Sequence, residues 1–352
     1  MPLCSREQIQ DGEWQKVRLD RPPFAPRVYP PYPCGEVPDA EAYRTGWDTW
    51  EWKPWDAIVQ RQDEDPKCEF TKWNKELFCE LLQNETVVLT GDSLTQEHYL
   101  TLSDQLGTAV YPPAPVLHNT SDTNNATQPP KAPLLTPIEP TYEKYACNGT
   151  VEIYLRRDDY LNPQKVDWEV NNKLPTIAVL NRGAHHVDDN STVRLVQAYI
   201  ESARTWQRKC HEQNRQCTLV WRTSVPGHVN CGQYMGGGAI NNLTLMETTL
   251  AGSAVARKFH WTDFQRQNQL ILRALQESGI DYQILDAYYI NMRRPDGHRS
   301  SRDCLHSCVG SKIEVYSQIL LHFVRMRHQQ QQSLDALQQP WWPHKSLDGG
   351  IL

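Results

Sequence analysis

Ser93 stands where a nucleophile would be expected in this 352-residue chain. It follows the β-branched run 86–90 and the pair Gly91-Asp92, and apolar residues recur every three to four positions after it. This pattern predicts a buried strand, a tight turn and a helix. The Ser93 hydroxyl would then lie at the sheet edge, with its N–H at a helix amino terminus that stabilises negative charge. Helix capping, an ordinary role for Ser and Asp, is an equally good interpretation.

A base and an orienting carboxylate for Ser93 stand late in the chain, at His306 and Asp303. A serine nucleophile needs a general base, and the base needs a carboxylate that holds its tautomer. The short spacing brings Asp303 and His306 to the same side of a turn, from which both can reach Ser93. Two exposed polar residues in a loop are the alternative, which the presence of Ser93 makes less attractive.

Other polar residues follow the next predicted strands. The Asn181 amide and the Gly183 N–H could complete an oxyanion hole beside the Ser93 N–H, with His185 close by. A plain turn that ends in glycine is the alternative for this segment. Arg222 ends a strand, where it could bind a substrate hydroxyl or a carboxylate, or serve as a structural ion-pair partner.

Three segments contain zinc-binding residue types without the spacing of a zinc site. They are Cys304-x-His306-x-Cys308, Cys210-His211 with Cys217, and His185-His186-x-Asp188-Asp189. None contains the paired C-x-x-C knuckles of structural zinc, and an oxidising compartment favours disulfides instead. We therefore expect no metal ion.

Strand-length apolar runs alternate with helical stripes along the chain. The runs cover residues 86–90, 176–180, 218–221 and 282–286, and the last helix starts at Ser311. Such alternation predicts an α/β fold with three layers, α/β/α, around a mainly parallel sheet. Reactive groups in such folds gather just past the carboxyl ends of the strands, where Ser93, Asn181 and Arg222 fall.

Composition divides the chain into three parts. Residues 1–85 are rich in Trp and Pro, and we expect an irregular lobe that is held by disulfides and packs on the catalytic domain. Residues 86–328 form that α/β domain, with the Pro-rich stretch 111–141 as an exposed insertion. Residues 329–352 form a polar tail.

The composition also bounds partners and compartment. A net charge of −6 argues against nucleic acid as a partner, and a mean hydropathy of −0.65 without a long apolar run excludes an integral membrane protein. Ten cysteines and six Asn-x-Ser/Thr sequons favour the secretory pathway, in the Golgi lumen or outside the cell. We expect a monomer, attached to a membrane only through a targeting segment missing from this chain. The sequons begin at Asn84, Asn119, Asn125, Asn148, Asn190 and Asn242.

Six ordered blocks resemble the trichome-birefringence-like or PC-esterase family, a branch of the SGNH/GDSL hydrolases. They are Trp50-Glu51-Trp52-Lys53-Pro54, Cys68-Glu69-Phe70-x-x-Trp73-Asn74, Gly91-Asp92-Ser93-Leu94, Val179-Leu180-Asn181-x-Gly183-x-His185, Trp221-Arg222-Thr223-x-x-Pro226-x-His228 and Asp303-Cys304-x-His306-x-Cys308. A lone Gly-Asp-Ser is weak evidence, but six blocks in the family's order are strong. The resemblance implies an SGNH-like fold and a polysaccharide O-acetyltransferase that needs an acetyl donor and no other cofactor.

The chain departs from the family's pattern in two of these regions. Ser307 follows the histidine where the family usually has Trp, and Val309-Gly310-Ser311 replaces a Pro-Gly. Residues 95–98 replace an Asn/Arg-rich run. These changes leave the nucleophile and the base intact, and they affect the specificity for the acceptor. One N-terminal cysteine is displaced from the usual set, and no disulfide pairing is assigned.

Residues and resemblance together predict a two-step acyl transfer, in which Ser93 takes an acyl group and His306 activates the acceptor oxygen. A sugar hydroxyl as acceptor makes the enzyme an O-acetyltransferase, whereas water makes it a carbohydrate acetylesterase. A glycan-binding protein with a vestigial site is the non-enzymatic alternative, disfavoured by the intact triad. Arginines crowd the loop before the pair and would favour an acidic sugar unless they are merely solvated. These are Arg293, Arg294, Arg299 and Arg302.

Overall fold

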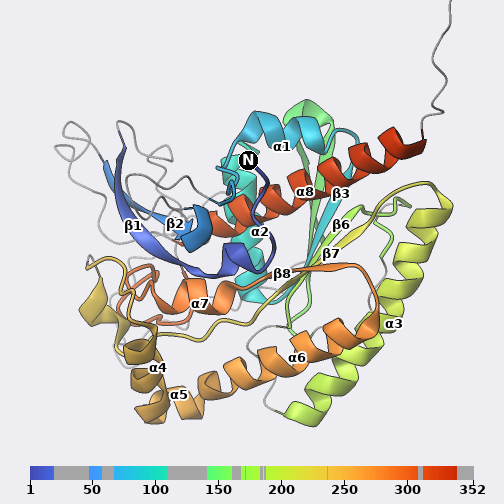
Figure 1. The fold of residues 1–352 in the computed structure, drawn as a ribbon. Helices are drawn as coiled ribbons and strands as arrows, with labels where there is room; N and C mark the ends of the chain where they lie inside the picture. The colour runs from blue at the N-terminus through green and yellow to red at the C-terminus, as the bar shows by residue number, and fades with distance from the viewer. Residues whose placement is uncertain are drawn as a thin grey trace, which may run out of the picture.

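A central six-stranded sheet organises the chain (Figure 1). The computed structural model describes residues 1–19, 47–57, 67–108, 141–160, 168–170, 172–182, 185, 188–235, 237–307 and 312–338. The sheet has the order β4-β5-β3-β6-β7-β8, and its neighbours are parallel except for β4, which pairs antiparallel with β5 at one edge. The strands are β3 (Thr86–Gly91), β4 (Thr141–Ala146), β5 (Val151–Arg157), β6 (Ile177–Leu180), β7 (Thr218–Arg222) and β8 (Tyr282–Leu285).

Helices cover both faces of this sheet. One face packs against α1, α2 and α8, and the other packs against α3 and α6, as Figure 1 shows. The predicted α/β fold with a mainly parallel sheet is thereby confirmed. The helices are α1 (Lys75–Leu81), α2 (Ser93–Gln105), α3 (Asp189–Glu212), α4 (Leu243–Gly252), α5 (Ala254–Lys258), α6 (Phe264–Ser278), α7 (Ala287–Met292) and α8 (Glu314–Gln338).

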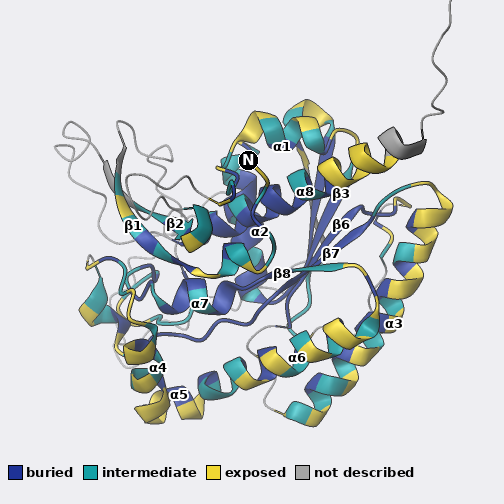
Figure 2. Ribbon diagram, in the orientation of Figure 1, coloured by how far each residue is buried: buried dark blue, intermediate teal, exposed yellow. Residues whose placement is uncertain are grey.

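Strand β3 shows why the sheet carries helices on both sides. Its residues are all buried, and successive side chains point to opposite faces. Val87 and Leu89 join the core under α2 and α8, whereas Val88 joins the core under α3 and α6. Figure 2 shows the resulting pattern, with a buried sheet and with exposed residues along the outer sides of α3 and α6.

Strands β4 and β5 extend the sheet beyond the four predicted strands. The run of β5 is interrupted by Glu152, a residue that rarely enters a sheet core. Its carboxylate is held by the Lys173 ammonium, the Thr86 hydroxyl at 3.4 Å and the Tyr154 hydroxyl at 3.2 Å. A charged residue inside an otherwise apolar run hides the strand from a search for apolar continuity.

The N-terminal region is more regular than expected. Strands β1 (Gly12–Leu19) and β2 (Trp47–Pro54) form a separate antiparallel pair. Trp14 and Trp52 meet edge to face at 5.9 Å between ring centroids and are buried in the core that also contains β3. A disulfide joins Cys4 to Cys68. The division of the chain at residue 85 stays a prediction.

The remaining predicted segments lie partly outside the described residues. Of the insertion 111–141, only Thr141 is described, as the first residue of β4. Helix α8 begins at Glu314 and continues to Gln338, so the predicted polar tail starts as helix. Among the described helices, none combines the length and apolarity needed to cross a bilayer.

Candidate active site

A tight strand-to-helix turn presents Ser93 as the first residue of α2. Asp92 precedes it as the N-cap, and its Oδ1 accepts a hydrogen bond from the Leu94 N–H at 3.0 Å. A side chain at Gly91 would place Cβ 2.3 Å from Thr95 Oγ1 and 2.9 Å from the Asn181 carbonyl oxygen. Glycine is therefore required at this position by the closeness of α2 and of the chain after β6.

The structure brings Ser93, His306 and Asp303 into one hydrogen-bonded chain. His306 Nε2 lies 2.9 Å from Ser93 Oγ, and His306 Nδ1 lies 3.0 Å from Asp303 Oδ2 and 3.1 Å from Asp303 Oδ1. The His306 side chain is 25% exposed, so a small molecule can reach it from solvent. This order of nucleophile, imidazole and carboxylate is the order that acyl transfer requires.

The electrostatics of this chain keep Asp303 ionised. Burial by itself would raise the pKa of Asp303, but hydrogen bonds from the ring and the backbone N–H of His306, with the charges of His306 and Arg299, lower the pKa to about 2. An ionised Asp303 fixes the proton of His306 on Nδ1. Nε2 is then free to accept the proton of Ser93.

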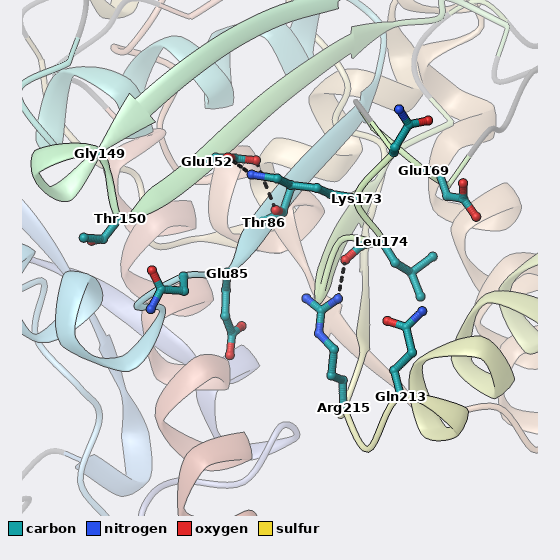
Figure 3. A pocket seen from close by; sticks show the side chains of 12 residues that line it. Glu85, Thr86, Gly149, Thr150, Glu152, Glu169, Lys173, Leu174, Gln213 and Arg215 are labelled. Carbon is teal, nitrogen blue, oxygen red and sulfur yellow. Dashed lines mark hydrogen bonds and ion pairs between the residues drawn. The ribbon is translucent and has the colours of Figure 1, made fainter.

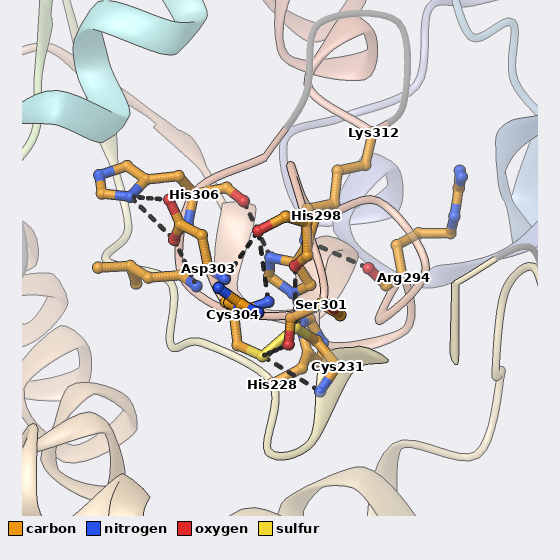
Figure 4. The surroundings of a disulfide bond; sticks show 12 residues. His228, Cys231, Arg294, His298, Ser301, Asp303, Cys304, His306 and Lys312 are labelled. Carbon is orange, nitrogen blue, oxygen red and sulfur yellow. Dashed lines mark hydrogen bonds and ion pairs between the residues drawn. A yellow bond between two sulfur atoms is a disulfide. The ribbon is translucent and has the colours of Figure 1, made fainter. Parts of the chain in front are cut away.

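Contacts with the segment after β7 hold the loop that carries Asp303 and His306. A disulfide joins Cys304 to Cys231, and the Cys304 carbonyl accepts the His228 N–H at 2.9 Å (Figure 4). The Asp303 N–H donates to Ser300 Oγ at 3.1 Å. The position of Asp303 and His306 is thus fixed by contacts of Asp303 and of its neighbour Cys304.

Glu97 connects this loop to the helix that carries Ser93. It lies one turn after Ser93 on α2, and it is 2% exposed. Its Oε1 pairs with Arg299 at 2.5 Å and its Oε2 accepts the Ser307 N–H at 3.1 Å. Sequence analysis considered Arg299 only as a contact for an acidic sugar and did not identify Glu97 as a site residue, although an acidic residue one helical turn from a nucleophile was an available signal.

Two arginines of the loop, Arg294 and Arg299, bind carboxylates of the protein itself. Arg294 makes two hydrogen bonds to the Asp296 carboxylate, at 2.7 and 2.9 Å, and lies over the ring of Trp14. Arg299 pairs with Glu97. These two residues therefore have partners inside the protein, which weakens the argument for an acidic sugar.

The other predicted site residues that the structure describes, Asn181, His185 and Arg222, lie at or past the carboxyl ends of β6 and β7 and make no hydrogen bond to the Ser93–His306–Asp303 chain. Asn181 Nδ2 donates to the Arg222 carbonyl at 2.9 Å, and Arg222 Nη2 donates to Thr95 Oγ1 at 2.9 Å. Both side chains are buried. His185 is more exposed and packs beside Tyr160, while Gly183 lies outside the described residues. Their roles in an oxyanion hole or in substrate binding stay predictions.

The cysteines that were weighed as zinc ligands form disulfides where they are described. Cys210 pairs with Cys217, and Cys304 pairs with Cys231. Cys308 lies outside the described residues, as does Cys34. A disulfide sulfur has no thiolate to offer a metal.

A polar cavity of about 520 Å³ lies at the opposite end of the sheet, by the amino ends of β3 and β5 (Figure 3). Glu152 and Lys173 form an ion pair in it, and Arg215 donates to the Leu174 carbonyl at 3.0 Å. Ser93 follows the carboxyl end of β3, so this cavity is separate from the candidate active site.

No protein-family model matches the chain. It is 22% identical to xyloglucan O-acetyltransferase 3 of Populus trichocarpa, over 84% of this chain and 81% of that protein. It is 20% identical to protein trichome birefringence-like 23 of Arabidopsis thaliana, over 89% of this chain and 79% of that protein.

The chain is also 20% identical to xyloglucan O-acetyltransferase 4 of Populus trichocarpa, over 86% of this chain and 79% of that protein. Similarity over most of the chain to relatives of these names supports the predicted family and its enzyme class, O-acetyltransferase. Over most of its length the chain is therefore similar to proteins of the trichome-birefringence-like family.

Proposed function

We propose that the protein transfers an acetyl group to a hydroxyl of a polysaccharide through an acetyl-Ser93 intermediate. The observation that carries this proposal is the hydrogen-bonded chain from Asp303 through His306 to Ser93. The relatives named as xyloglucan O-acetyltransferases support a polysaccharide acceptor. The disulfides support an enzyme of the secretory pathway, and the Golgi lumen or the cell exterior is the proposed site of action.

The first step forms the acyl-enzyme. His306 Nε2 takes the proton of the Ser93 hydroxyl while Oγ bonds to the carbonyl carbon of the acetyl donor. The carbonyl oxygen becomes an oxyanion next to the amino end of α2, whose N–H groups stabilise negative charge. When the intermediate collapses, the bond to the leaving group breaks and His306 returns the proton to that group.

The second step delivers the acetyl group. His306 takes the proton of a sugar hydroxyl, whose oxygen attacks the acetyl carbon, and the bond to Ser93 Oγ breaks as Ser93 regains a proton. Throughout, Asp303 stabilises the imidazolium without itself taking a proton. Water in place of the sugar completes the same cycle as hydrolysis, which would make the protein an acetylesterase.

The intermediate can be tested directly with p-nitrophenyl acetate as donor. We expect intact-protein mass spectrometry to find one added acetyl group, located on Ser93 by peptide mapping. Ser93→Ala should lose the adduct and reduce turnover by several orders of magnitude, because residues of a triad act as a unit. Ser253→Ala is the control, since Ser253 also lies at the amino end of a helix, as the N-cap of α5, where its Oγ accepts the Ala256 N–H. A folded Ser93→Ala variant that keeps most of its turnover rules this proposal out.

Adding xylo- or gluco-oligosaccharides to the acetylated enzyme separates transferase from esterase. A transferase gives acetylated oligosaccharide and regenerates free Ser93 faster than buffer alone. Free acetate at an unchanged rate, with no acetylated sugar, identifies an esterase. Binding of the sugars without any acetyl adduct identifies a glycan-binding protein.

A further inference from the structure

Two buried imidazoles, those of His228 and His298, form a row that ends at the backbone of His306 (Figure 4). His298 Nδ1 lies 3.0 Å from the His306 carbonyl oxygen, and His298 Nε2 lies 2.7 Å from His228 Nδ1. His228 Nε2 lies 3.1 Å from the carbonyl oxygen of Met292, the last residue of α7. His228 and His298 are only 2% and 1% exposed. A continuous row of polar contacts therefore connects α7 to the residue that faces Ser93.

The backbone of His306 decides where its imidazole points. Its N–H donates to Asp303 Oδ1 at 3.1 Å, and its carbonyl accepts from the Arg299 N–H at 3.3 Å as well as facing His298. Because groups on both sides of the His306 Cα are held, the direction of the Cα–Cβ bond is fixed. The imidazole could then move away from Ser93 only by rotating about its own side-chain bonds. Its hydrogen bond to Asp303 opposes that rotation.

Proton counting shows how the row can be bonded. It has three contacts, and the two carbonyl oxygens at its ends only accept, so three hydrogen bonds would need three protons. Two neutral imidazoles carry two. Burial, and secondarily the charge of the buried Lys312, lowers the pKa of both His228 and His298, which disfavours a third proton. Two protons satisfy the two shorter contacts when the contact between His228 and Met292 is the one that carries no proton.

We propose that His228 and His298 are positioning residues for His306. They act as a neutral pair in which His228 Nδ1–H donates to His298 Nε2 and His298 Nδ1–H donates to the His306 carbonyl. His228 thus fixes the tautomer of His298, and His298 fixes the backbone of His306. This inference rests on the proposed role of His306 as general base, since the two histidines act only through it.

Two substitutions of His298 separate positioning from packing. Asn carries its amide nitrogen at the place of the His Nδ1, so His298→Asn can still donate to the His306 carbonyl. Gln carries its amide nitrogen near the place of Nε2, so His298→Gln can contact His228 but leaves the carbonyl of His306 without this donor. Both replacements are uncharged amides, so a purely structural role would not separate them in this direction.

The readout is the rate at which a fluorophosphonate labels Ser93. In that reaction Oγ bonds to phosphorus, fluoride leaves and His306 takes the serine proton, so the rate reports the Ser93–His306 contact without any acetyl donor or sugar. We expect labelling of His298→Gln to be slower than wild type by on the order of 10–100-fold, with a Tm close to that of His298→Asn. His298→Asn should label at close to the wild-type rate. Equal labelling rates for the two folded variants overturn the proposal.

The tautomers give a second, independent measurement. Two-bond ¹H–¹⁵N correlation spectra of wild-type protein labelled at histidine nitrogens should show Nδ1–H on both His228 and His298 at neutral pH, assigned with the His298→Asn variant. A proton on Nε2 of His298, or on both nitrogens of either ring, overturns the proposal even if His298→Gln does not fold. If the wild-type Ser93 is not labelled at all, the proposed function itself fails, which the spectra would show separately from the state of the pair.

Discussion

At the scale of single residues, the ionisation of Asp303 determines the lowest pH at which the interaction between Asp303 and His306 still stabilises the fold. The pKa of Asp303 in the fold is about 2, below the ordinary value of 3.8 that it regains on unfolding. A carboxyl whose pKa is lowered by folding stabilises the fold above its unfolded pKa, and it loses that contribution as the pH falls through its folded pKa.

We therefore expect the difference in Tm between wild type and Asp303→Asn to persist down to about pH 4 and to shrink only between about pH 4 and pH 2. Thermal unfolding of both proteins across this range measures it. A Tm difference that vanishes already near neutral pH contradicts this assignment.

The sequence predicted those site residues that belong to a pattern only a few positions long. Ser93 follows a recognisable strand, and Asp303 and His306 stand three residues apart. Glu97 and His298 were not predicted because their roles depend on residues far along the chain. Glu97 meets Arg299 across 202 positions, and His298 meets His228 across 70. Such contacts have no local pattern to be read.

At the scale of elements, the turn between β3 and α2 leaves no room for a side chain at Gly91. An alanine Cβ would lie 2.3 Å from Thr95 Oγ1 and 2.9 Å from the Asn181 carbonyl oxygen, well inside contact distance. We expect Gly91→Ala to lower the free energy of unfolding by about 1–3 kcal/mol, typical of overpacking, and to displace Ser93. Urea unfolding and Ser93 labelling measure the two effects. Gly252→Ala is the control, because nothing lies within 4 Å of its Cβ.

The contact between α2 and the catalytic loop depends on Glu97. Glu97→Gln would leave the Arg299 guanidinium, whose side chain is 18% exposed, without its carboxylate partner. Because breaking a buried pair from one side is costly, we expect a loss of about 2–4 kcal/mol of stability together with lower turnover.

Glu69→Gln is the matched control for Glu97→Gln. Glu69 also pairs with an arginine, Arg325, through both carboxylate oxygens, but that pair is more exposed and lies away from Ser93. Its loss should cost less than about 1 kcal/mol and leave turnover unchanged. Equal effects of the two substitutions in urea unfolding contradict a special role for Glu97.

Among the elements, apolar runs predicted β3, β6, β7 and β8 and missed β4 and β5, which lie together at one side of the sheet. Strands β3, β6 and β7 are buried along their whole length because helices cover both of their faces, whereas β8 is buried only at Ile284 and Leu285. In β5 the buried Glu152 breaks the run, and the sequence of the edge strand β4 contains the adjacent charged residues Glu143 and Lys144. Polar residues are tolerated at an edge because one side of the strand is unpaired, and this weakens its sequence pattern.

At the scale of the whole molecule, disulfides crosslink the chain. Eight of the ten cysteines form four bonds in the described residues, so at most two thiols remain to be titrated. Under denaturing, non-reducing conditions we expect no more than two thiols per chain, and a reductant should lower the Tm substantially. Eight or more free thiols would contradict an oxidising compartment and return Cys304 to consideration as a metal ligand.

The spacing of these bonds determines what the protein becomes when it unfolds. Three of them join residues 64, 68 and 73 positions apart, and they follow one another along the chain. In the chain-entropy model each such loop removes about 4 kcal/mol of freedom from the denatured ensemble. The oxidised denatured chain is therefore a string of closed loops with a smaller radius than the reduced chain. Because less surface becomes exposed on unfolding, the oxidised protein should have the smaller denaturant m-value.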